Sequence, residues 1–379
     1  MELAERPGPP DEPARPSLSL RRRIRRRLLS WFDKARRDLP WRRNRDPYRI
    51  WVSEVMLQQT TVAAVVPYFE RFLSAFPTLQ DLAAAPEQQV LRLWEGLGYY
   101  RRVRHLHRAA RQLASAHGGT FPDDPEVLRQ LPGMGRYTVG AVLSQAFDRR
   151  LPILEANSLR ALCRLFGRTD DPRRGPAQRW LWQVAEDLLP VRRVGDFNQA
   201  LMELGALVCT PAAPRCGDCP LAVDCVARRL GLQESIPARA APPAATEVRE
   251  AAVVIRRGPD VLLVQRPESA PRWASIWEFP HGPLEDGEAH EDAPLRLARD
   301  LGLDVALGQE LLTLRHGVTR FRITMACFEA DYVRGRFRSD FYRRGSWVAP
   351  GRLAEYPVSA PQRRLGQALL APDRQRSLF

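Results

Sequence analysis

The sequence predicts a helical domain followed by a small α+β domain. Between residue 19 and about residue 230, apolar residues recur at helical spacing between short turns that contain Gly or Pro. After a Pro/Ala-rich segment, the pattern changes to short apolar runs typical of strands. A length of 379 residues is enough for two such cores. The predicted divisions are a disordered tail (1–18), the helical domain (19–230), a linker (231–248) and the α+β domain (249–370).

The charge balance points to a polyanionic partner. Lys and Arg number 58 against 44 Asp and Glu, which gives a net charge of +14. No stretch is long and apolar enough to span a membrane, and the Pro-rich N-terminus lacks the apolar core of a secretion signal. The predicted localisation is therefore cytoplasmic.

The first predicted helix begins near Ser19 and contains the run RRRIRRR. Leu20, Ile24, Leu28 and Trp31 repeat at helical spacing, so the arginines are expected to form the solvated face of an amphipathic helix. A nucleic-acid patch is the alternative.

A strongly apolar helix is predicted over residues 50–69, with Glu54 in its middle. Gln58 and Thr61 are expected on the same face, at i+4 and i+7. A carboxyl among apolar neighbours is poorly solvated and its pKa should rise, as a general acid at neutral pH requires. The alternative is a glutamate paired with an arginine.

The segment LPGMGRYTVGAV, residues 131–142, places Gly133 and Gly135 between apolar helical stretches. Glycines let backbone N–H groups approach a phosphate closely, and the next helix adds the positive end of its dipole. The segment therefore predicts a phosphate-binding hairpin, with a plain helix–helix turn as the alternative.

A second acid, Glu155, lies at the N-terminus of another predicted helix, in the segment LPILEANSLRALCRLFG. Asn157 and Ser158 are the expected N-cap residues, and Gly167 is the expected stop. Glu155 is either a capping carboxylate that the helix dipole favours or a charged group with a chemical role.

Four of the six cysteines fall in one Pro-rich loop, CTPAAPRCGDCPLAVDC. This density indicates a metal centre, for which zinc and [4Fe–4S] are both chemically possible. Zinc sites usually pair two CxxC knuckles, whereas only one occurs here, so the C-x6-C-x2-C-x5-C spacing favours iron–sulfur. The predicted ligands are Cys209, Cys216, Cys219 and Cys225.

In the C-terminal domain, apolar runs 252–255 and 261–264 flank Gly258-Pro259-Asp260, which predicts a β-hairpin. Further strands are expected at 311–314 and 321–328, and a helix near 294–301.

Taken together, the cysteine loop, the hairpin, and the strings SEVMLQQT, GLGYYRR and PRWASIWEFPHG resemble MutY-type adenine DNA glycosylases of the endonuclease III, or helix-hairpin-helix, superfamily. The resemblance covers roughly residues 19–350. It implies a helix-hairpin-helix glycosylase domain with a [4Fe–4S] loop at 209–225, followed by a Nudix-like lesion-recognition domain.

The resemblance also implies catalytic roles. Glu54 would protonate the adenine ring, and Glu155 would stabilise the cationic sugar. Asn157 and Tyr137 would orient the water and the carboxylates. Relatives that also cut the DNA backbone carry a lysine at the position of Tyr137, so its tyrosine implies a monofunctional glycosylase; simple packing is the other reading of this tyrosine.

The resemblance also implies which residues contact DNA. Tyr99 would be the aromatic wedge that stacks in the duplex, although burial of Tyr99 and Tyr100 in a core is an alternative. The full expected set is Gln58, Gln59, Thr60, Leu97, Tyr99, Gly133, Gly135, Arg136, Thr319 and Arg320.

Three positions depart from the family pattern. Glu155 replaces the usual aspartate. Arg296-Leu-Ala-Arg-Asp300 replaces the acidic Nudix cluster near Glu288, which argues against Mg²⁺-dependent hydrolysis. Val318-Thr319-Arg320 replaces the Phe-Ser-His loop that reads 8-oxoguanine, so that recognition is expected in altered form.

The predicted function is removal of adenine mispaired with 8-oxoguanine or guanine by a nucleoid-associated monomer acting on double-stranded DNA. A lesion-binding protein with weak catalysis is one alternative, motivated by Glu155. A thymine or uracil mismatch glycosylase on the same scaffold is another.

Overall fold

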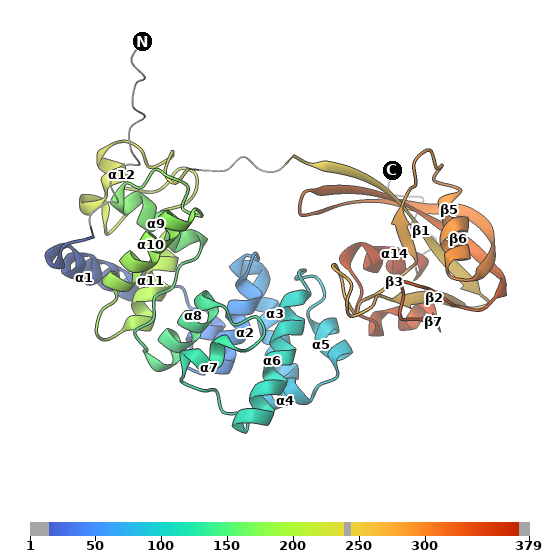
Figure 1. Cartoon of the computed structure of the whole chain (residues 1–379), viewed down its shortest axis with the longest axis horizontal. Coiled ribbons are helices and arrows are strands. Elements are labelled where there is room, and N and C mark those ends of the chain that lie inside the picture. Colours follow the sequence, from blue (N-terminus) through green and yellow to red (C-terminus); the bar gives the residue numbers. More distant parts are fainter. Residues whose placement is uncertain (1–14, 239–243, 371–379) are drawn as a thin grey trace, which may run out of the picture. The chain divides into compact units, whose positions relative to one another are not determined.

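The computed structural model describes residues 15–238 and 244–370 (Figure 1). Most of the expected tail and part of the expected linker therefore lie outside the described residues. The chain forms two compact units: Met1–Glu70 with Gln112–Ala241, and Arg71–Arg111 with Pro242–Phe379. The second unit thus combines part of the predicted helical domain with the predicted α+β domain.

The first unit is helical, as predicted. Its elements are α1 (Leu18–Ala35), η1 (Pro40–Arg42), α2 (Pro47–Leu57), the start of α3 (Val62–Ala75), the end of α6 (Arg101–His117), α7 (Pro125–Arg129), α8 (Arg136–Phe147), α9 (Ala156–Phe166), α10 (Gly175–Leu188), α11 (Val194–Leu207), η2 (Ala222–Asp224) and α12 (Val226–Arg229).

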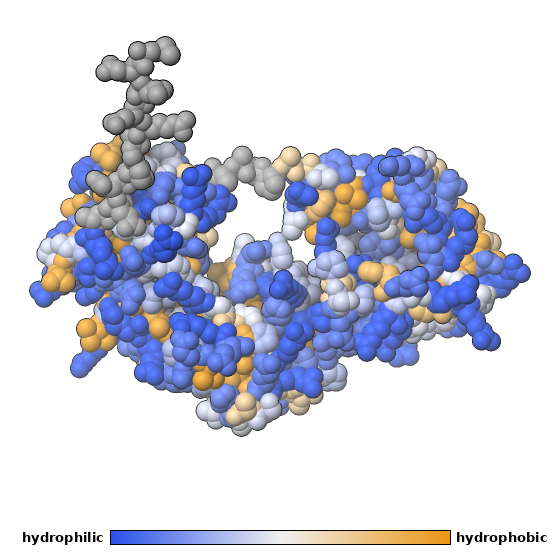
Figure 2. Space-filling view, in the orientation of Figure 1, coloured by the Kyte–Doolittle hydropathy of each residue, from blue (hydrophilic) through white to orange (hydrophobic). Residues whose placement is uncertain are grey.

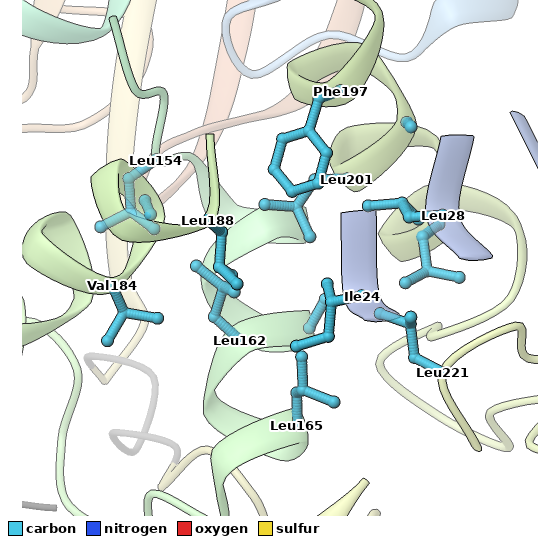
Figure 3. Close-up of a cluster of buried hydrophobic side chains, with 14 of the residues drawn as sticks. Ile24, Leu28, Leu154, Leu162, Leu165, Val184, Leu188, Phe197, Leu201 and Leu221 are labelled. Atoms are coloured by element: carbon cyan, nitrogen blue, oxygen red, sulfur yellow. The ribbon is translucent and has the colours of Figure 1, made fainter. Parts of the chain in front are cut away.

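One core holds α1, α9, α10, α11 and the cysteine loop together (Figure 3). Ile24 and Leu28 of α1 are buried in it, together with Leu162 of α9 and Leu221 of the loop. The amphipathic pattern predicted for the first helix is therefore confirmed, and the loop that carries the cysteines is fastened to the helical core.

Two glycines of α11 allow it to approach its neighbours closely. A Cβ at Gly195 would lie 2.4 Å from the backbone oxygen of Ser144 in α8. A Cβ at Gly205 would lie 2.6 Å from the Cβ and the backbone oxygen of Asn157 in α9. Because no side chain intervenes, α11 brings α8 and α9 together at the site described below.

The helix predicted over residues 50–69 is wrong as a single element. α2 ends at Leu57, and α3 begins at Val62. Gln59, between them, has a φ of 59°, a left-handed conformation that interrupts helical hydrogen bonding. Gln58 and Thr61 consequently do not continue the face of Glu54.

The second unit contains α4 (Leu79–Ala84), α5 (Glu87–Leu93) and a seven-stranded sheet. The strands are β1 (Thr246–Arg257), β2 (Asp260–Gln265), β3 (Trp277–Glu278), β4 (His281–Pro283), β5 (Leu303–Val318), β6 (Phe321–Gly335) and β7 (Arg344–Val348). They run in the order β3-β2-β1-β6-β5, with β4 paired to β1 and β7 to β2. The predicted hairpin and the later strands are confirmed.

Alternate residues of β1 enter two different cores. Ala252 and Val254 pack in the core that includes Leu365 of α14 (Ala360–Leu370). Val253 and Ile255 pack with Ala298 of α13 (Ala293–Asp300). Both faces of the strand are buried, which explains its continuous apolar run.

Helix α5 is attached to the sheet by side-chain hydrogen bonds. Trp277 Nε1 donates to Gln88 Oε1 at 2.9 Å, and Gln88 Nε2 donates to the backbone oxygen of Ser275 at 3.2 Å. Arg363 forms a two-pronged ion pair with Glu95, just beyond α5. These contacts account for the grouping of residues 71–111 with the C-terminal part of the chain.

The surface in view in Figure 2 is mostly hydrophilic, with scattered hydrophobic residues. In the described part of the chain, no helix combines the length and apolarity needed to cross a membrane.

Candidate active site and nucleic-acid interface

Glu54 of α2 is buried, with 4% of its surface exposed. Its Oε2 accepts a hydrogen bond from Tyr137 Oη at 2.6 Å, and its Oε1 accepts one from Gln145 Nε2 at 2.9 Å; both partners lie on α8. Burial raises the pKa of Glu54, and the nearby charge of Glu155 adds to this, although the two hydrogen bonds and Arg42 oppose it. The predicted environment of a general acid is present.

Tyr137 does more than pack. Its side chain is half-buried on α8, and its hydroxyl contacts Glu54 at 2.6 Å and the sulfur of Met202 at 3.4 Å. Burial and the negative charge of Glu54 raise the pKa of Tyr137 well above its ordinary value, so the phenol keeps its proton. Tyr137 is therefore a fixed neutral donor to one oxygen of the acid.

Glu155 itself is the N-cap of α9. Its Oε2 accepts from Asn157 N at 2.8 Å, and its Oε1 accepts from Ser158 N at 2.7 Å. The prediction that Asn157 and Ser158 supply the N-cap is wrong. Ser158 is the N3 residue of a capping box, in which its Oγ accepts a hydrogen bond from Glu155 N. The predicted stop at Gly167 is confirmed, with a left-handed φ of 71°.

A chain of hydrogen bonds through Asn157 and Arg160 holds the Glu155 carboxylate in place. Asn157 Nδ2 donates to Glu155 Oε2 at 3.1 Å. Arg160, 8% exposed, donates to Asn157 Oδ1 at 2.8 Å and to the backbone oxygen of Cys209 at 2.8 Å. Asn157 therefore orients the carboxylate and is itself held from the start of the cysteine loop.

Beside Glu54 lies a cavity of about 560 Å³. Trp41 and Ile50 form apolar parts of its wall, Arg37 and Arg42 form cationic parts, and Gln145 links it to Glu54. Glu203 holds both arginines: it accepts from Arg37 Nε at 2.7 Å and from Arg42 at 3.0 Å. Apolar side chains beside arginine donors can hold a heterocycle.

The 131–142 hairpin joins α7 to α8. Gly133 has a φ of 78°, and Gly135 is the N-cap of α8. A Cβ at Gly135 would meet nothing within 4 Å, so the backbone there is open to an approaching group. Arg136, the first residue of α8, lies 3.9 Å from the ring centre of Trp182. The hairpin has the exposed backbone and helix N-terminus that phosphate binding needs.

The four cysteines of the loop line one cavity together with Arg164, and none of them is in a disulfide. Arg164 is 1% exposed and donates to Cys209 Sγ at 3.4 Å and to the backbone oxygen of Thr210 at 2.7 Å. Burial raises the pKa of Cys219 to about 11, and the neighbouring thiols add to this effect. Within the described residues, no three His, Cys, Asp or Glu side chains form a group that would hold a single metal ion.

In the second unit, the turn before α6 presents Tyr99 to solvent with 51% of its surface exposed. Leu97, predicted to contact DNA, is only 7% exposed, and Tyr100 is buried, donating to the backbone oxygen of Val358 at 3.0 Å. The alternative of core burial thus holds for Tyr100 and not for Tyr99. Arg102 supports the turn: it donates to the carbonyls of Leu97 and Gly98, and its guanidinium lies 5.5 Å from the Tyr99 ring centre.

Three residues that are predicted to contact DNA have a strained backbone conformation. Gln59, Tyr99 and Thr319 have φ values of 59°, 47° and 53°. Left-handed non-glycine residues cost about 1–3 kcal/mol and cluster at functional sites. Thr319 and Arg320 form the exposed two-residue turn between β5 and β6, since Val318 pairs with Phe321.

Comparison with known proteins finds two segments of this chain that match known domain families. Residues 52–187 match the HhH-GPD superfamily of base excision DNA repair proteins, and residues 251–368 match the NUDIX domain. The adenine DNA glycosylase of Rattus norvegicus is 40% identical in an alignment of length 324 that covers 72% of this chain and 63% of the rat protein. Residues 52–187 therefore form an HhH-GPD domain, and residues 251–368 form a NUDIX domain.

The adenine DNA glycosylase of Homo sapiens is 39% identical, over 69% of this chain and 58% of the human protein. The chain therefore spans less than two thirds of the length of these relatives. Among solved structures, a thermostable thymine-DNA glycosylase is 29% identical with a TM-score of 0.50, and the match covers 55% of this chain and 97% of that one. The helical HhH-GPD fold and the C-terminal NUDIX fold predicted from the sequence are confirmed.

In the first unit, the sequence analysis missed five residues of this site: Gln145, Glu203, Arg37, Arg42 and Trp41. Glu203 is 1% exposed. Burial opposes its ionisation, but hydrogen bonds from Arg37 and Arg42 outweigh this and lower the pKa of Glu203 to about 2. The segment RRDLPWRR lies a few residues before α2, and nothing in its pattern indicates that Arg37 and Arg42 bind a carboxylate 166 and 161 positions away.

Replacing Glu203 with alanine is expected to lower the free energy of unfolding at pH 7 by about 1–3 kcal/mol, because two partly buried guanidinium groups lose their acceptor. Urea titration of the parent and the variant measures this. A matched change at the exposed pair, Asp38→Ala, should cost less than about 1 kcal/mol. Equal effects of the two changes would contradict the assigned role of Glu203.

In the NUDIX domain, Glu288 is held by Arg296, which donates to Oε1 at 2.7 Å and to Oε2 at 2.8 Å. These bonds lower the pKa of Glu288 to about 2. Arg296 also lies 3.8 Å from Asp300. Arg296 therefore occupies both carboxylate oxygens of Glu288 with its guanidinium.

Proposed function

We propose that this chain is a DNA glycosylase that hydrolyses the N-glycosidic bond of adenine mispaired with 8-oxoguanine or guanine in double-stranded DNA. The observation that carries the proposal is a pair of carboxyl groups in opposite environments. Glu54 is buried and has a raised pKa, whereas Glu155 accepts two backbone N–H bonds at a helix N-terminus. The relatives named adenine DNA glycosylase support the choice of base.

The different environments of Glu54 and Glu155 give the two carboxyl groups different roles. Cleavage of a purine glycosidic bond needs protonation of the base and stabilisation of an oxocarbenium-like sugar. The Glu54 carboxyl delivers its proton to the ring of a flipped adenine, while Tyr137 and Gln145 fix the orientation of the acid. The Glu155 carboxylate stabilises the cation, and Asn157 and Tyr137 orient the carboxylates and the attacking water. Trp41 and Arg42 in the adjoining cavity are suited to holding the base.

The chemistry is proposed to stop at base removal. Strand cleavage by this superfamily's bifunctional members requires an amine nucleophile, and Tyr137 stands where their lysine stands. Lys34 is the only lysine in the sequence, and it lies exposed on α1. The product expected is therefore an intact strand with an abasic site.

DNA opening is assigned to the strained, exposed residues. Tyr99 inserts into the stack, Gln59 and its neighbours Gln58 and Thr60 contact bases beside the lesion, and the hairpin at Gly133–Arg136 holds a phosphate. In the NUDIX domain, the ion pair of Glu288 with Arg296 favours recognition over hydrolysis, with Thr319 and Arg320 contacting the 8-oxoguanine strand.

We further propose a [4Fe–4S] cluster held by Cys209, Cys216, Cys219 and Cys225. Four reduced thiols around one cavity, with a buried arginine beside Cys209, are the donor set for such a cluster, which when bound would supply a rigid anchor for the loop. A visible absorbance band and iron and sulfide analysis of the purified protein test this assignment against zinc.

The glycosylase proposal is tested by single-turnover assays on duplexes that contain A opposite 8-oxoguanine, A opposite G, A opposite T, and T or U opposite G. We expect free adenine from the first two, and strand breaks only after alkaline treatment. Release of thymine or uracil would favour the mismatch-glycosylase alternative. Tight binding without any released base would favour a lesion-binding protein.

A further inference from the structure

The arginine run of α1 places its side chains in three directions. At 100° per residue, Arg21 and Arg25 flank one side of the buried Ile24–Leu28 stripe, Arg23 and Arg27 flank the other, and Arg22 and Arg26 face away from it. The predicted solvated face therefore holds only for the third pair, and the structure corrects it for the other two.

One flanking pair meets the cysteine loop. Arg23 Nε donates to Asp224 Oδ1 at 2.8 Å, and Arg27 donates to Asp224 Oδ2 at 3.0 Å. The Asp224 side chain is only 7% exposed, whereas those of Arg23 and Arg27 are 39% and 33% exposed. Both oxygens of a nearly buried carboxylate are thus held by charge-assisted bonds from α1.

The other flanking pair binds the end of α10. Arg25 donates to the backbone oxygens of Leu188 and Asp187, at 2.8 and 2.7 Å, and Arg21 pairs with the Asp187 side chain at 3.0 Å. These are carbonyls at a helix C-terminus, where cations are favoured. α1 is therefore fixed to the helical core independently of its contact with the loop.

Asp224 directly precedes Cys225, and Leu221, two residues after Cys219, is buried against the apolar stripe of α1 (Figure 3). The segment between these two cysteines therefore has one apolar and one ionic attachment, both to the same helix. Backbone bonds within the loop are single turns, such as Ala222 N to the oxygen of Cys219 at 3.1 Å. The geometry of this segment depends on an element almost 200 residues earlier in the chain.

We propose that α1 is a clamp on the cysteine loop, in which Arg23 and Arg27 act through Asp224 as positioning residues for Cys219 and Cys225. The clamp keeps these two thiols facing the cavity shared with Cys209 and Cys216. The inference deepens the proposed cofactor assignment, and it gives the arginine run a role other than nucleic-acid binding.

The test compares two double variants that remove the same residue type and the same charge from one helix: Arg23→Gln/Arg27→Gln and Arg22→Gln/Arg26→Gln. The first readout is the rate at which each cysteine of metal-free protein is alkylated by iodoacetamide, resolved by mass spectrometry of peptides. We expect about a tenfold faster alkylation of Cys219 and Cys225 in the first variant, and less than about a twofold change in the second. Asp224→Asn, which keeps the side-chain shape, should reproduce the effect if the first variant folds poorly.

The second readout is the half-life of the visible absorbance band of the loaded protein in the presence of a chelator and oxidant, which should shorten only in the first variant and in Asp224→Asn. Equal behaviour of the two double variants in alkylation would overturn the clamp. If no cofactor is present, the alkylation difference persists and only the cofactor assignment fails. Because alkylation needs no DNA, failure of the glycosylase proposal is also distinguishable.

Discussion

Glu54→Gln is expected to slow single-turnover adenine release by about 10²- to 10⁴-fold, the usual contribution of a general acid. The amide keeps the shape of the side chain and one acceptor oxygen, but it has no proton to give to the base. The hydrogen-bond partners Tyr137 and Gln145 remain available to hold it. Rapid-quench measurement of free adenine from an A opposite 8-oxoguanine duplex provides the rate.

The same substitution is expected to stabilise the fold at neutral pH. The folded-state pKa of Glu54 is raised above its ordinary 4.5, so the unfolded chain releases this proton at a lower pH than the folded chain does. Across the interval between those two pKa values, the parent loses stability as pH rises, and the amide does not. Urea titrations at several pH values measure this difference.

The pH–rate profile of the parent follows from the same shift. The acid form of Glu54 is the active one, so the rate should fall as pH rises through the raised pKa, and this limb should be absent in Glu54→Gln. A variant that cleaves as fast as the parent, or a parent rate that increases steadily with pH, would refute the role of Glu54 as acid.

Glu155→Asn is expected to reduce the rate by about 10²- to 10³-fold, the usual loss when one preorganised electrostatic group is removed. Asparagine is as good an N-cap as aspartate, so the start of α9 should be preserved while the negative charge is lost. Glu155→Asp is the matched variant: it keeps both the cap and the charge, and we expect its rate within about tenfold of the parent. Single-turnover rates and unfolding free energies of both variants provide the comparison.

The pair separates two roles that the structure combines in one side chain. A carboxylate bound to Asn157 N and Ser158 N is a cap by geometry. If Glu155→Asn and Glu155→Asp cleave at the same rate, capping is its whole function. A loss confined to the uncharged variant, with equal unfolding free energies, assigns the negative charge to the sugar cation.

Several parts of the fold were predictable because their determinants are local. The stop at Gly167 needs only a residue that tolerates positive φ, and the β1–β2 hairpin needs only a turn between two apolar runs. The amphipathic stripe of α1 follows from spacing alone. The division of residues 50–69 into two helices was missed because the hydrophobic periodicity continues across Gln59. No local sequence pattern indicates that the backbone of Gln59 is left-handed.

The site was predictable only in part, for the same reason. An acid in an apolar helix predicted burial and a raised pKa for Glu54, and the structure bears both out. The identity of its partners was beyond local reasoning, since Gln145 lies 91 positions away. For Glu155, a capping role was one of two predicted readings, and only the conformation of its side chain showed that it caps α9 in place of Asn157 and Ser158.

The sequence by itself determined that the chain has a helical domain with a hairpin and a four-cysteine loop, followed by an α+β domain, because spacing and residue type encode these locally. Only the tertiary structure decided which charges meet: Glu203 with Arg37 and Arg42, Asp224 with Arg23 and Arg27, and Glu54 with Tyr137. The physical reason is that the solvation and pairing of a charge depend on groups distant in sequence, which packing alone brings within a few ångströms.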